Sequence, residues 1–232
     1  DELYDKSYND KPTPADVIAG VDDGRSVINY IGHGSATSWV SSRFSNRDIE
    51  NLNNGLKLPI IWSVACVNGK FEGTYDCFAE RWMKTGSKSS PRGAAMIFAA
   101  STNAAWVPPC VMQAEIIHNL LCKEQKFTVG GQAFNGILKA MEVYGTTDKS
   151  QGNMIMEQYN IFGDCSMLIR SRKPSKADVT VTRANGEVDI KVASEGRALG
   201  RARVAVYSSD MNTWNSAVTD ETGSVNLKVD GD

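Results

Sequence analysis

The first 170 residues alternate between short apolar runs and amphipathic stretches. The apolar runs at 26–31, 58–65 and 93–100 are rich in β-branched and aromatic residues and have the length of buried strands. A shorter final strand is expected at 166–170. Helical spacing of apolar residues, with capping and breaking residues at the ends, predicts five helices, at 14–23, 47–52, 76–85, 111–122 and 132–144. Strands that alternate with helices predict an α/β fold with a largely parallel sheet flanked by helices.

The pattern changes after a basic, proline-containing stretch at 170–176, which has the composition of a linker. Beyond it, valines and other apolar residues alternate with polar ones, and Asn185-Gly186 and Thr222-Gly223 supply turns. This period of two predicts a small antiparallel β domain. We therefore expect an α/β unit over residues 1–172 and a β domain over 173–232.

The first two predicted strands each stop at a reactive side chain with glycine nearby. The first ends at Gly32-His33-Gly34 and the second at Ala65-Cys66, with Gly69 three residues later. A strand, a helix and a second strand joined by a right-handed crossover would lie parallel, with both reactive residues at the same carboxyl edge. Open α/β sheets bind ligands at that edge. A thiol and an imidazole so placed are the minimum for thiol acyl transfer.

Charge and composition narrow the function classes. Lys and Arg total 25 against 27 Asp and Glu, which gives no electrostatic reason to expect a nucleic acid or an anionic membrane as partner. No apolar stretch approaches the roughly 18–20 residues that span a bilayer, so no transmembrane segment is expected. The five cysteines form no Cys-x-x-Cys pair, and the chain has only two histidines, His33 and His118, so structural zinc is not expected.

The two reactive segments resemble the catalytic segments of the gingipains, the cysteine endopeptidases of peptidase family C25. They are His33-Gly34-Ser35 and Ala65-Cys66-Val67-Asn68-Gly69. The resemblance covers most of residues 23–170 and matches the arginine-specific branch best. A His-Gly strand end together with an Ala-Cys strand end is also the signature of caspase-like proteases. Further matches lie at Cys77-Phe78-Ala79-Glu80, Ala100-Ser101-Thr102, Trp106 and Ile161-Phe162-Gly163-Asp164.

The resemblance implies a role for each of these segments. Cys66 would be the nucleophile and form a thioacyl-enzyme, and His33 would be the general acid and base. The backbone N–H groups of Gly34 and Cys66 would form the oxyanion hole, where one donor is commonly worth about 3 kcal/mol. No cofactor is needed for this chemistry, although gingipains bind structural calcium. A β domain that follows the catalytic domain would be immunoglobulin-like, and residues 173–232 are few for a complete sandwich of about 100 residues.

Substrate binding is implied for Trp106, Ser101 and Thr102. In gingipains a tryptophan at the position of Trp106 lines the S1 pocket, where its face can hold the arm of a basic residue. Two neighbours, Ala104 and Cys110, depart from the arginine-specific pattern. The acidic residue that marks the lysine-specific branch is also missing, and we expect cleavage after arginine.

In arginine-specific relatives, the carboxylate of the pocket and the glutamate that orients the histidine lie upstream, and residues 1–25 match neither segment. Expected partners are therefore protein or peptide substrates and the N-terminal half of the catalytic unit as a separate chain. The resemblance implies secretion or attachment to the bacterial outer surface. Two alternatives stay open: a processing transpeptidase of a bacterial secretion system, and a binding or scaffold homologue without turnover. The intact His33 and Cys66 count against the second.

Overall fold

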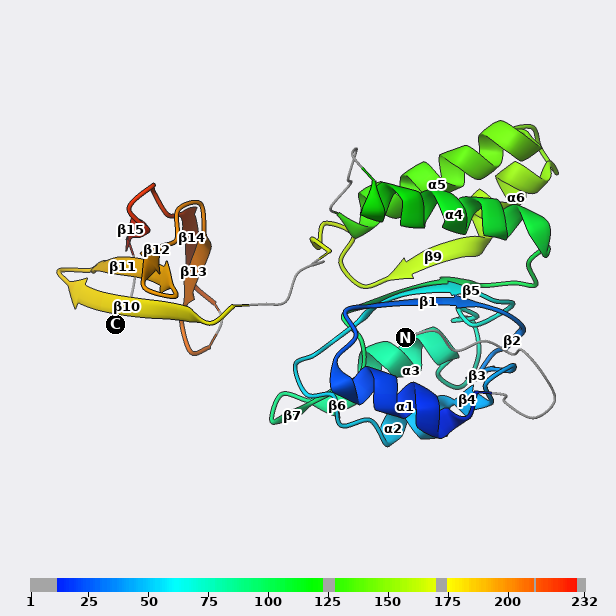
Figure 1. Ribbon diagram of the computed structural model, residues 1–232, viewed down its shortest axis with the longest axis horizontal. Helices are drawn as coiled ribbons and strands as arrows, with labels where there is room; N and C mark the ends of the chain where they lie inside the picture. The colour runs from blue at the N-terminus through cyan, green and yellow to red at the C-terminus, as the bar shows by residue number, and fades with distance from the viewer. Residues whose placement is uncertain (1–11, 123–127, 170–174, 211, 229–232) are drawn as a thin grey trace. The chain divides into compact units, whose positions relative to one another are not determined.

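The computed structural model describes residues 12–122, 128–169, 175–210 and 212–228. The chain divides into two compact units, Asp1–Ser171 and Arg172–Asp232. Figure 1 labels their helices and strands. Unit 1 contains α1 (Pro14–Asp23), β1 (Val27–Ile31), β2 (Gly34–Ser35), β3 (Ser38–Trp39), β4 (Phe44–Ser45), α2 (Asn46–Glu50), β5 (Ile60–Val64), α3 (Phe78–Lys84), β6 (Gly86–Ser87), β7 (Ser90–Pro91), β8 (Met96–Ala100), α4 (Val107–Leu121), α5 (Val129–Tyr144), α6 (Gln151–Gln158) and β9 (Tyr159–Phe162).

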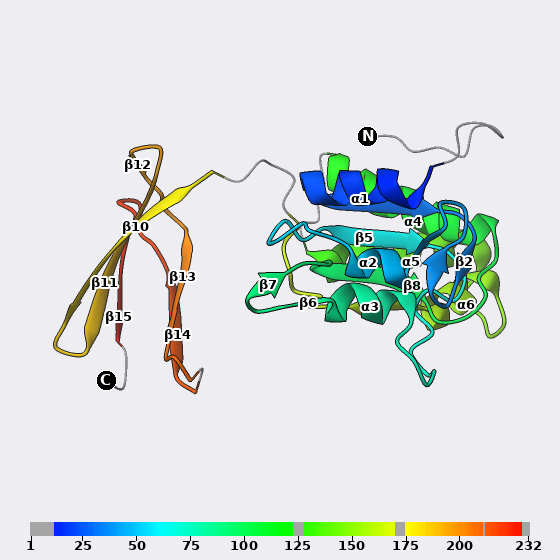
Figure 2. The ribbon, with the colours of Figure 1, turned by 90° about the horizontal axis from the view of Figure 1, so that it is seen from below.

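The sheet of unit 1 has the strand order β1-β5-β8-β9. Strands β1, β5 and β8 run parallel, and β9 is antiparallel to β8. Helices α1, α2 and α3 lie on one face of this sheet, and α4, α5 and α6 lie on the other (Figures 1 and 2). The prediction of a largely parallel sheet flanked by helices is therefore confirmed.

Alternate residues of the central strands pack into two separate cores. Every residue of β5 and β8 is buried. Trp62 and Phe98 point to the core under α4 and α5, whereas Ile61 and Ile97 point to the core on the other face. Such continuous burial explains why both strands read as unbroken apolar runs. Burying each large side chain contributes about 1.5–3 kcal/mol, so the two cores together hold the sheet rigid.

The end of unit 1 differs from the prediction. The final strand is β9, at Tyr159–Phe162, and the amphipathic helix α6 precedes it. The strand expected at 166–170 is wrong: Leu168 makes only an isolated bridge to Thr128, and residue 170 lies outside the described residues. Helix α4 also begins earlier than the expected residue 111 because two prolines occupy its first turn, where their missing N–H groups break no helical hydrogen bond.

Unit 2 is antiparallel, as predicted. Strand β11 pairs with β10, β12 and β15, and β13 pairs with β14. Asn185 and Gly186 both have positive φ, which is the geometry of a type I′ hairpin turn. The strands of unit 2 are β10 (Ala177–Ala184), β11 (Glu187–Ser194), β12 (Arg197–Ala198), β13 (Arg203–Tyr207), β14 (Trp214–Val218) and β15 (Ser224–Lys228).

Two glycines with positive φ allow a matched test of the packing in unit 1. A Cβ on Gly93 (φ 100°) would lie 2.4 Å from the Trp82 carbonyl oxygen, whereas a Cβ on Gly55 (φ 57°) would meet nothing within 4 Å. Gly55→Ala should lower the free energy of unfolding by about 1 kcal/mol, the cost of left-handed backbone. Gly93→Ala should lower it by about 3 kcal/mol, because overpacking adds to that strain. Urea denaturation measures both losses, and equal losses would contradict the packing described here.

Candidate active site

Parallel pairing of β1 with β5 brings the two reactive segments together. Ile31 lies opposite Val64 in the register, and the Gly32 N–H donates to the Val64 carbonyl at 3.1 Å. His33 and Cys66 each follow two residues after this last pair. Both therefore emerge at the carboxyl edge of the sheet, where the sequence places them.

His33, Cys66 and Trp106 line one small cavity at this edge. The cavity has a volume of about 20 Å³, and Tyr159 and Ala104 are among its other lining residues. The His33 and Trp106 ring centroids are 5.4 Å apart at an interplanar angle of 37°. The Cys66 Sγ lies 3.7 Å from the Ala104 carbonyl oxygen. The imidazole is exposed and the thiol is half-buried, so a peptide can reach both side chains.

The substrate-binding role expected for Ser101 and Thr102 stays a prediction. Ser101 and Thr102 do not line this cavity. The backbone N–H and Oγ of Ser101 both donate to the Gln158 carbonyl, at 2.8 and 3.0 Å. The Thr102 carbonyl accepts from the Val67 N–H at 3.1 Å. In the structure both residues hold loops at the edge of the sheet.

The segment after Cys66 is held in a strained conformation. Val67 has φ 53°, a left-handed backbone that is a genuine outlier for a β-branched residue. Such strain costs about 1–3 kcal/mol and persists only where surrounding contacts enforce it. Here the bond to Thr102 is one such contact, and the Gly69 N–H donates to the Ala100 carbonyl at 2.8 Å. The turn that carries the thiol is thus fixed to the end of β8.

Gly34 comes very close to the backbone of Cys66. A Cβ at this position would lie 2.5 Å from the Cys66 carbonyl oxygen and 2.8 Å from the Ala65 Cβ. Any side chain would push the two segments apart, so the contact requires glycine. The residues expected to supply oxyanion donors, Gly34 and Cys66, are neighbours in space.

Asn68 joins the same two segments, and the sequence-based reasoning did not single it out. Its side chain is fully buried. The Nδ2 donates to the Ser35 carbonyl at 2.7 Å and to the Ser38 carbonyl at 3.0 Å, and the Oδ1 accepts from the Ser63 Oγ at 2.9 Å. The Ser63 Oγ also accepts from the Trp39 Nε1 at 2.9 Å. An asparagine in an apparent turn reads from sequence as a turn former, and nothing local signals its burial.

Tyr159 is a second site residue that the sequence did not reveal. It sits opposite Ala100 in the register and is only 5% exposed, with its ring centroid 5.2 Å from that of Phe98. Its hydroxyl has no hydrogen-bond partner among the described residues. Burial raises the pKa of Tyr159, and negative charge on Cys66 or Cys110 raises it further. The phenol is therefore neutral and lines the cavity beside the thiol.

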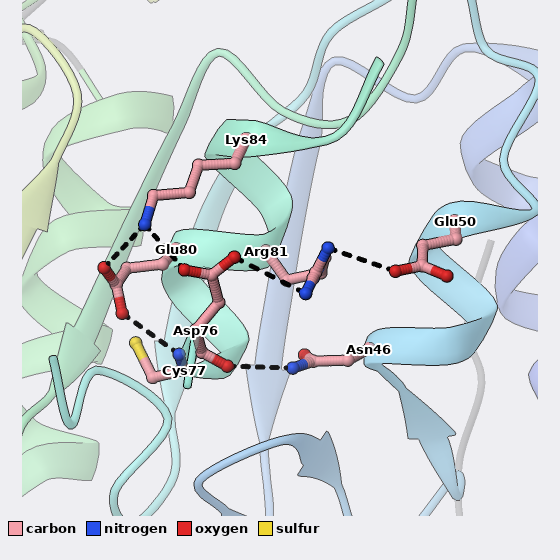
Figure 3. A network of polar contacts seen from close by, with 7 residues as sticks. All are labelled: Asn46, Glu50, Asp76, Cys77, Glu80, Arg81 and Lys84. Carbon is pink, nitrogen blue, oxygen red and sulfur yellow. Dashed lines mark hydrogen bonds and ion pairs between the residues drawn. The ribbon is translucent and has the colours of Figure 1, made fainter. Parts of the chain in front are cut away.

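An ionic network anchors the far end of the Cys66 loop (Figure 3). Asp76 accepts from the Lys84 Nζ at 2.6 Å, and its other oxygen lies 3.4 Å from an Arg81 nitrogen. Arg81 also pairs with Glu50 at 3.1 Å. The Cys77 N–H donates to Glu80 at 3.0 Å. The loop is thus bound to α2 and α3 where α3 begins.

The structural calcium that the resemblance implies stays a prediction. Within residues 12–122, 128–169, 175–210 and 212–228, no group of three or more His, Cys, Asp or Glu side chains could hold a metal ion. Those same ranges contain no helix that is long and apolar enough to cross a bilayer. His118 lies on α4 with its Nδ1 3.3 Å from the Cys122 Sγ and does not line the cavity.

The parallel sheet flanked by helices, with His33 and Cys66 at its carboxyl edge, is the caspase-like α/β fold of the gingipains. The sequence pattern of peptidase family C25 matches residues 2–170. The chain therefore belongs to peptidase family C25.

Individual relatives agree with this assignment. Gingipain R1 of Porphyromonas gingivalis is 33% identical over 96% of the chain, and gingipain R2 of the same species is 36% identical over 75%. The crystal structure of the Arg-specific cysteine proteinase gingipain R superposes with a TM-score of 0.69 and 30% identity over 95% of the chain. The chain spans 22–24% of the curated relatives and 50% of that solved chain.

The structure predicts which thiols react. Cys77 is fully buried, and burial is the main cause that raises its pKa to about 11. A raised thiol pKa favours the neutral form at pH 7.5, and only the thiolate is nucleophilic. Iodoacetamide at pH 7.5 should therefore label Cys66 and the exposed Cys122 and Cys165, and leave Cys77 unlabelled until urea unfolds the protein. Peptide mass mapping reads the result, and labelling of Cys77 at the rate of Cys122 would contradict it.

Proposed function

We propose that this chain carries the catalytic dyad of a cysteine endopeptidase, with Cys66 as nucleophile and His33 as general acid and base. The observation that carries the proposal is the convergence of both side chains, from two parallel strands, on one cavity. Membership of family C25 supports it independently. Nothing in the packing of the two cores requires this pair, because both side chains lie beyond the last paired strand residues.

The chemistry follows from these positions. The Cys66 thiolate attacks the carbonyl carbon of the scissile peptide bond, and the oxyanion forms beside the Gly34 and Cys66 N–H groups. The C–N bond then breaks, and the His33 imidazolium donates its proton to the leaving amine. A thioester remains on Cys66. Water attacks this thioester while His33 accepts its proton, and the acid product leaves with the thiolate restored.

We also propose that an arginine at P1 binds against the exposed face of Trp106, at the mouth of this cavity. The Trp106 side chain is 60% exposed and can cover the guanidinium by a cation–π contact, worth about 0.5–2 kcal/mol. The arginine specificity named for gingipain R supports this choice. None of the cavity-lining residues is acidic. We therefore propose that the matching carboxylate comes from the N-terminal half of the catalytic unit. We further propose that the enzyme acts outside the cell or on its outer surface.

Covalent labelling tests the dyad and the arginine pocket together. An arginyl chloromethyl ketone should add once to the purified protein, and Cys66→Ala should abolish the adduct. Intact mass measures the result. A protein labelled at Cys66 by iodoacetamide but not by the arginyl reagent would have an accessible thiol and no arginine pocket. Arginyl labelling that survives Cys66→Ala would overturn the assignment of the nucleophile.

Replacing Trp106 separates pocket binding from thiol reactivity. Trp106→Ala should slow modification by the arginyl chloromethyl ketone by about 3- to 30-fold, as the lost cation–π contact implies. Its rate with iodoacetamide should change by less than about twofold. Trp214 is 72% exposed in unit 2, so Trp214→Ala is a matched control that should change neither rate. Equal slowing of both reagents by Trp106→Ala would show that the ring supports the thiol and not the substrate.

A further inference from the structure

We propose that Asn68 is a positioning residue that holds the two halves of the oxyanion site at their working separation. This inference rests on the proposed function, because it assigns Asn68 to the site built from Gly34 and Cys66. Asn68 touches neither the nucleophile's sulfur nor the imidazole in any hydrogen bond of the described residues. Its role is to place backbone groups that do the chemistry.

The hydrogen bonds of Asn68 use its whole side chain. Both Nδ2 protons are donated, to Ser35 and Ser38, and Oδ1 accepts from Ser63. The backbone carbonyl of Asn68 accepts from the Ala79 N–H at 2.9 Å, which ties the residue to the first turn of α3. A buried amide with every donor satisfied has one orientation available, because any rotation would leave polar atoms unpaired.

The partners of Asn68 belong to the two segments that meet at the site. Ser35 and Ser38 flank the β2–β3 turn, directly after Gly34, and Ser63 lies on β5, three residues before Cys66. The chain of bonds closes on itself, since Ser63 also accepts from Trp39 and Trp39 follows Ser38. The histidine segment and the cysteine segment are thus joined by one polar ring on the side of the sheet that α3 covers.

The ring sets the position of Gly34. This glycine lies between His33 and Ser35, and a Cβ on it would be 3.1 Å from the Asn68 Nδ2 and 2.5 Å from the Cys66 carbonyl oxygen. An oxyanion donor must lie about 2.7–3.1 Å from the developing charge. A displacement of about 1 Å can lower a rate 100-fold. Loss of the Asn68 bonds removes the two side-chain bonds that fix the β2–β3 turn beside Gly34, while the Phe78 N–H still donates to the Ala36 carbonyl at 2.7 Å. We therefore expect the Gly34 N–H to shift without unfolding of the turn.

Asparagine is the side chain that this place requires. Aspartate has the same shape but lacks the two N–H donors, so an ionised carboxylate would face two carbonyl oxygens, and a protonated one could donate to only one of them. Asn68→Asp should therefore release at least one of the two bonds to the histidine segment. A purely structural role would show as lower stability without a selective loss at the oxyanion site.

The chain contains a matched control for this distinction. Asn54 is also buried, at 2% exposed, and its Nδ2 donates to the Lys57 and Gly93 carbonyls, both at 2.9 Å. Its Oδ1 accepts from the Gly93 N–H at 3.0 Å. Asn54 thus has the same pattern of two donations and one acceptance, and it does not line the cavity. Asn54→Asp imposes the same chemical change on the fold.

Two reagents distinguish an effect on oxyanion stabilisation from an effect on the reactivity of the Cys66 thiol. A peptidyl argininal adds to the Cys66 thiolate as a hemithioacetal, whose S–C bond forms while the aldehyde oxygen takes up the negative charge and then a proton. Iodoacetamide forms an S–C bond with loss of iodide and places no charge on oxygen. The inhibition constant of the first therefore reports oxyanion stabilisation. The rate at which the second alkylates Cys66, followed by peptide mass mapping, reports the reactivity of that thiolate alone.

For Asn68→Asp, we expect the argininal to bind roughly 10- to 100-fold more weakly and kcat to fall by a similar factor, with KM changed less than about twofold. The alkylation rate should stay within about threefold. Asn54→Asp should leave all four quantities unchanged. Should Asn68→Asp not fold, Ser63→Ala keeps both Nδ2 donations of Asn68 and removes the bond to its Oδ1, together with the bond that Ser63 accepts from the Trp39 Nε1. This variant should weaken argininal binding by about threefold, again without slowing alkylation.

Other outcomes are equally decisive. Unchanged argininal binding in a folded Asn68→Asp protein would overturn the positioning role, as would an equal loss with iodoacetamide or an equal loss in Asn54→Asp. A wild-type protein that neither binds the argininal nor hydrolyses arginyl substrates would instead overturn the proposed function, and the positioning role with it.

Discussion

The parallel pairing of β1 with β5 is the constraint on which the site depends. Ile31 lies opposite Val64 in the register, and two residues after this pair the β1 segment reaches His33 and the β5 segment reaches Cys66. A shift of one residue would turn every side chain of β1 to the opposite face and bury the wrong set. Because β5 is buried on both faces, this register is strongly fixed. Placement of the two reactive groups is therefore a by-product of forming the two cores.

Beyond the last paired residues of β1 and β5, hydrogen bonds and ion pairs, and not apolar packing, hold the chain in position. The turn at Val67 is strained, and Gly34 approaches Cys66 more closely than any side chain allows. Neither arrangement is favoured locally, so both need support from bonds to rigid elements. Asn68 supplies bonds on the side of the β2–β3 turn, Thr102 supplies one from the segment after β8, and the Asp76 network fixes the start of α3. The pattern is typical of sites whose strain is maintained by surrounding structure.

The sequence predicted those features whose cause is local. Apolar runs identify β5 and β8, and a reactive residue at the end of a run is visible without a structure. Asn68 and Tyr159 could not be found in this way, since their importance lies in burial and in partners from distant segments. Strand β9 was missed for a similar reason: Asn160 interrupts a short run, and pairing with β8 decides its structure. Tertiary context overrides weak local preference at such positions.

The lining of the cavity also bears on the proposed preference for arginine. A guanidinium brought into an apolar cavity loses hydration, and that loss is offset only by a paired charge or by good hydrogen bonds. Trp106 offers a cation–π contact, which falls short of a bidentate carboxylate. Strong discrimination for arginine therefore requires an acidic group in addition to the residues that line this cavity. Under the proposed function, the dyad of Cys66 and His33 and the charge that would select arginine are separable parts of the site, and the parallel strand pair carries the first of them.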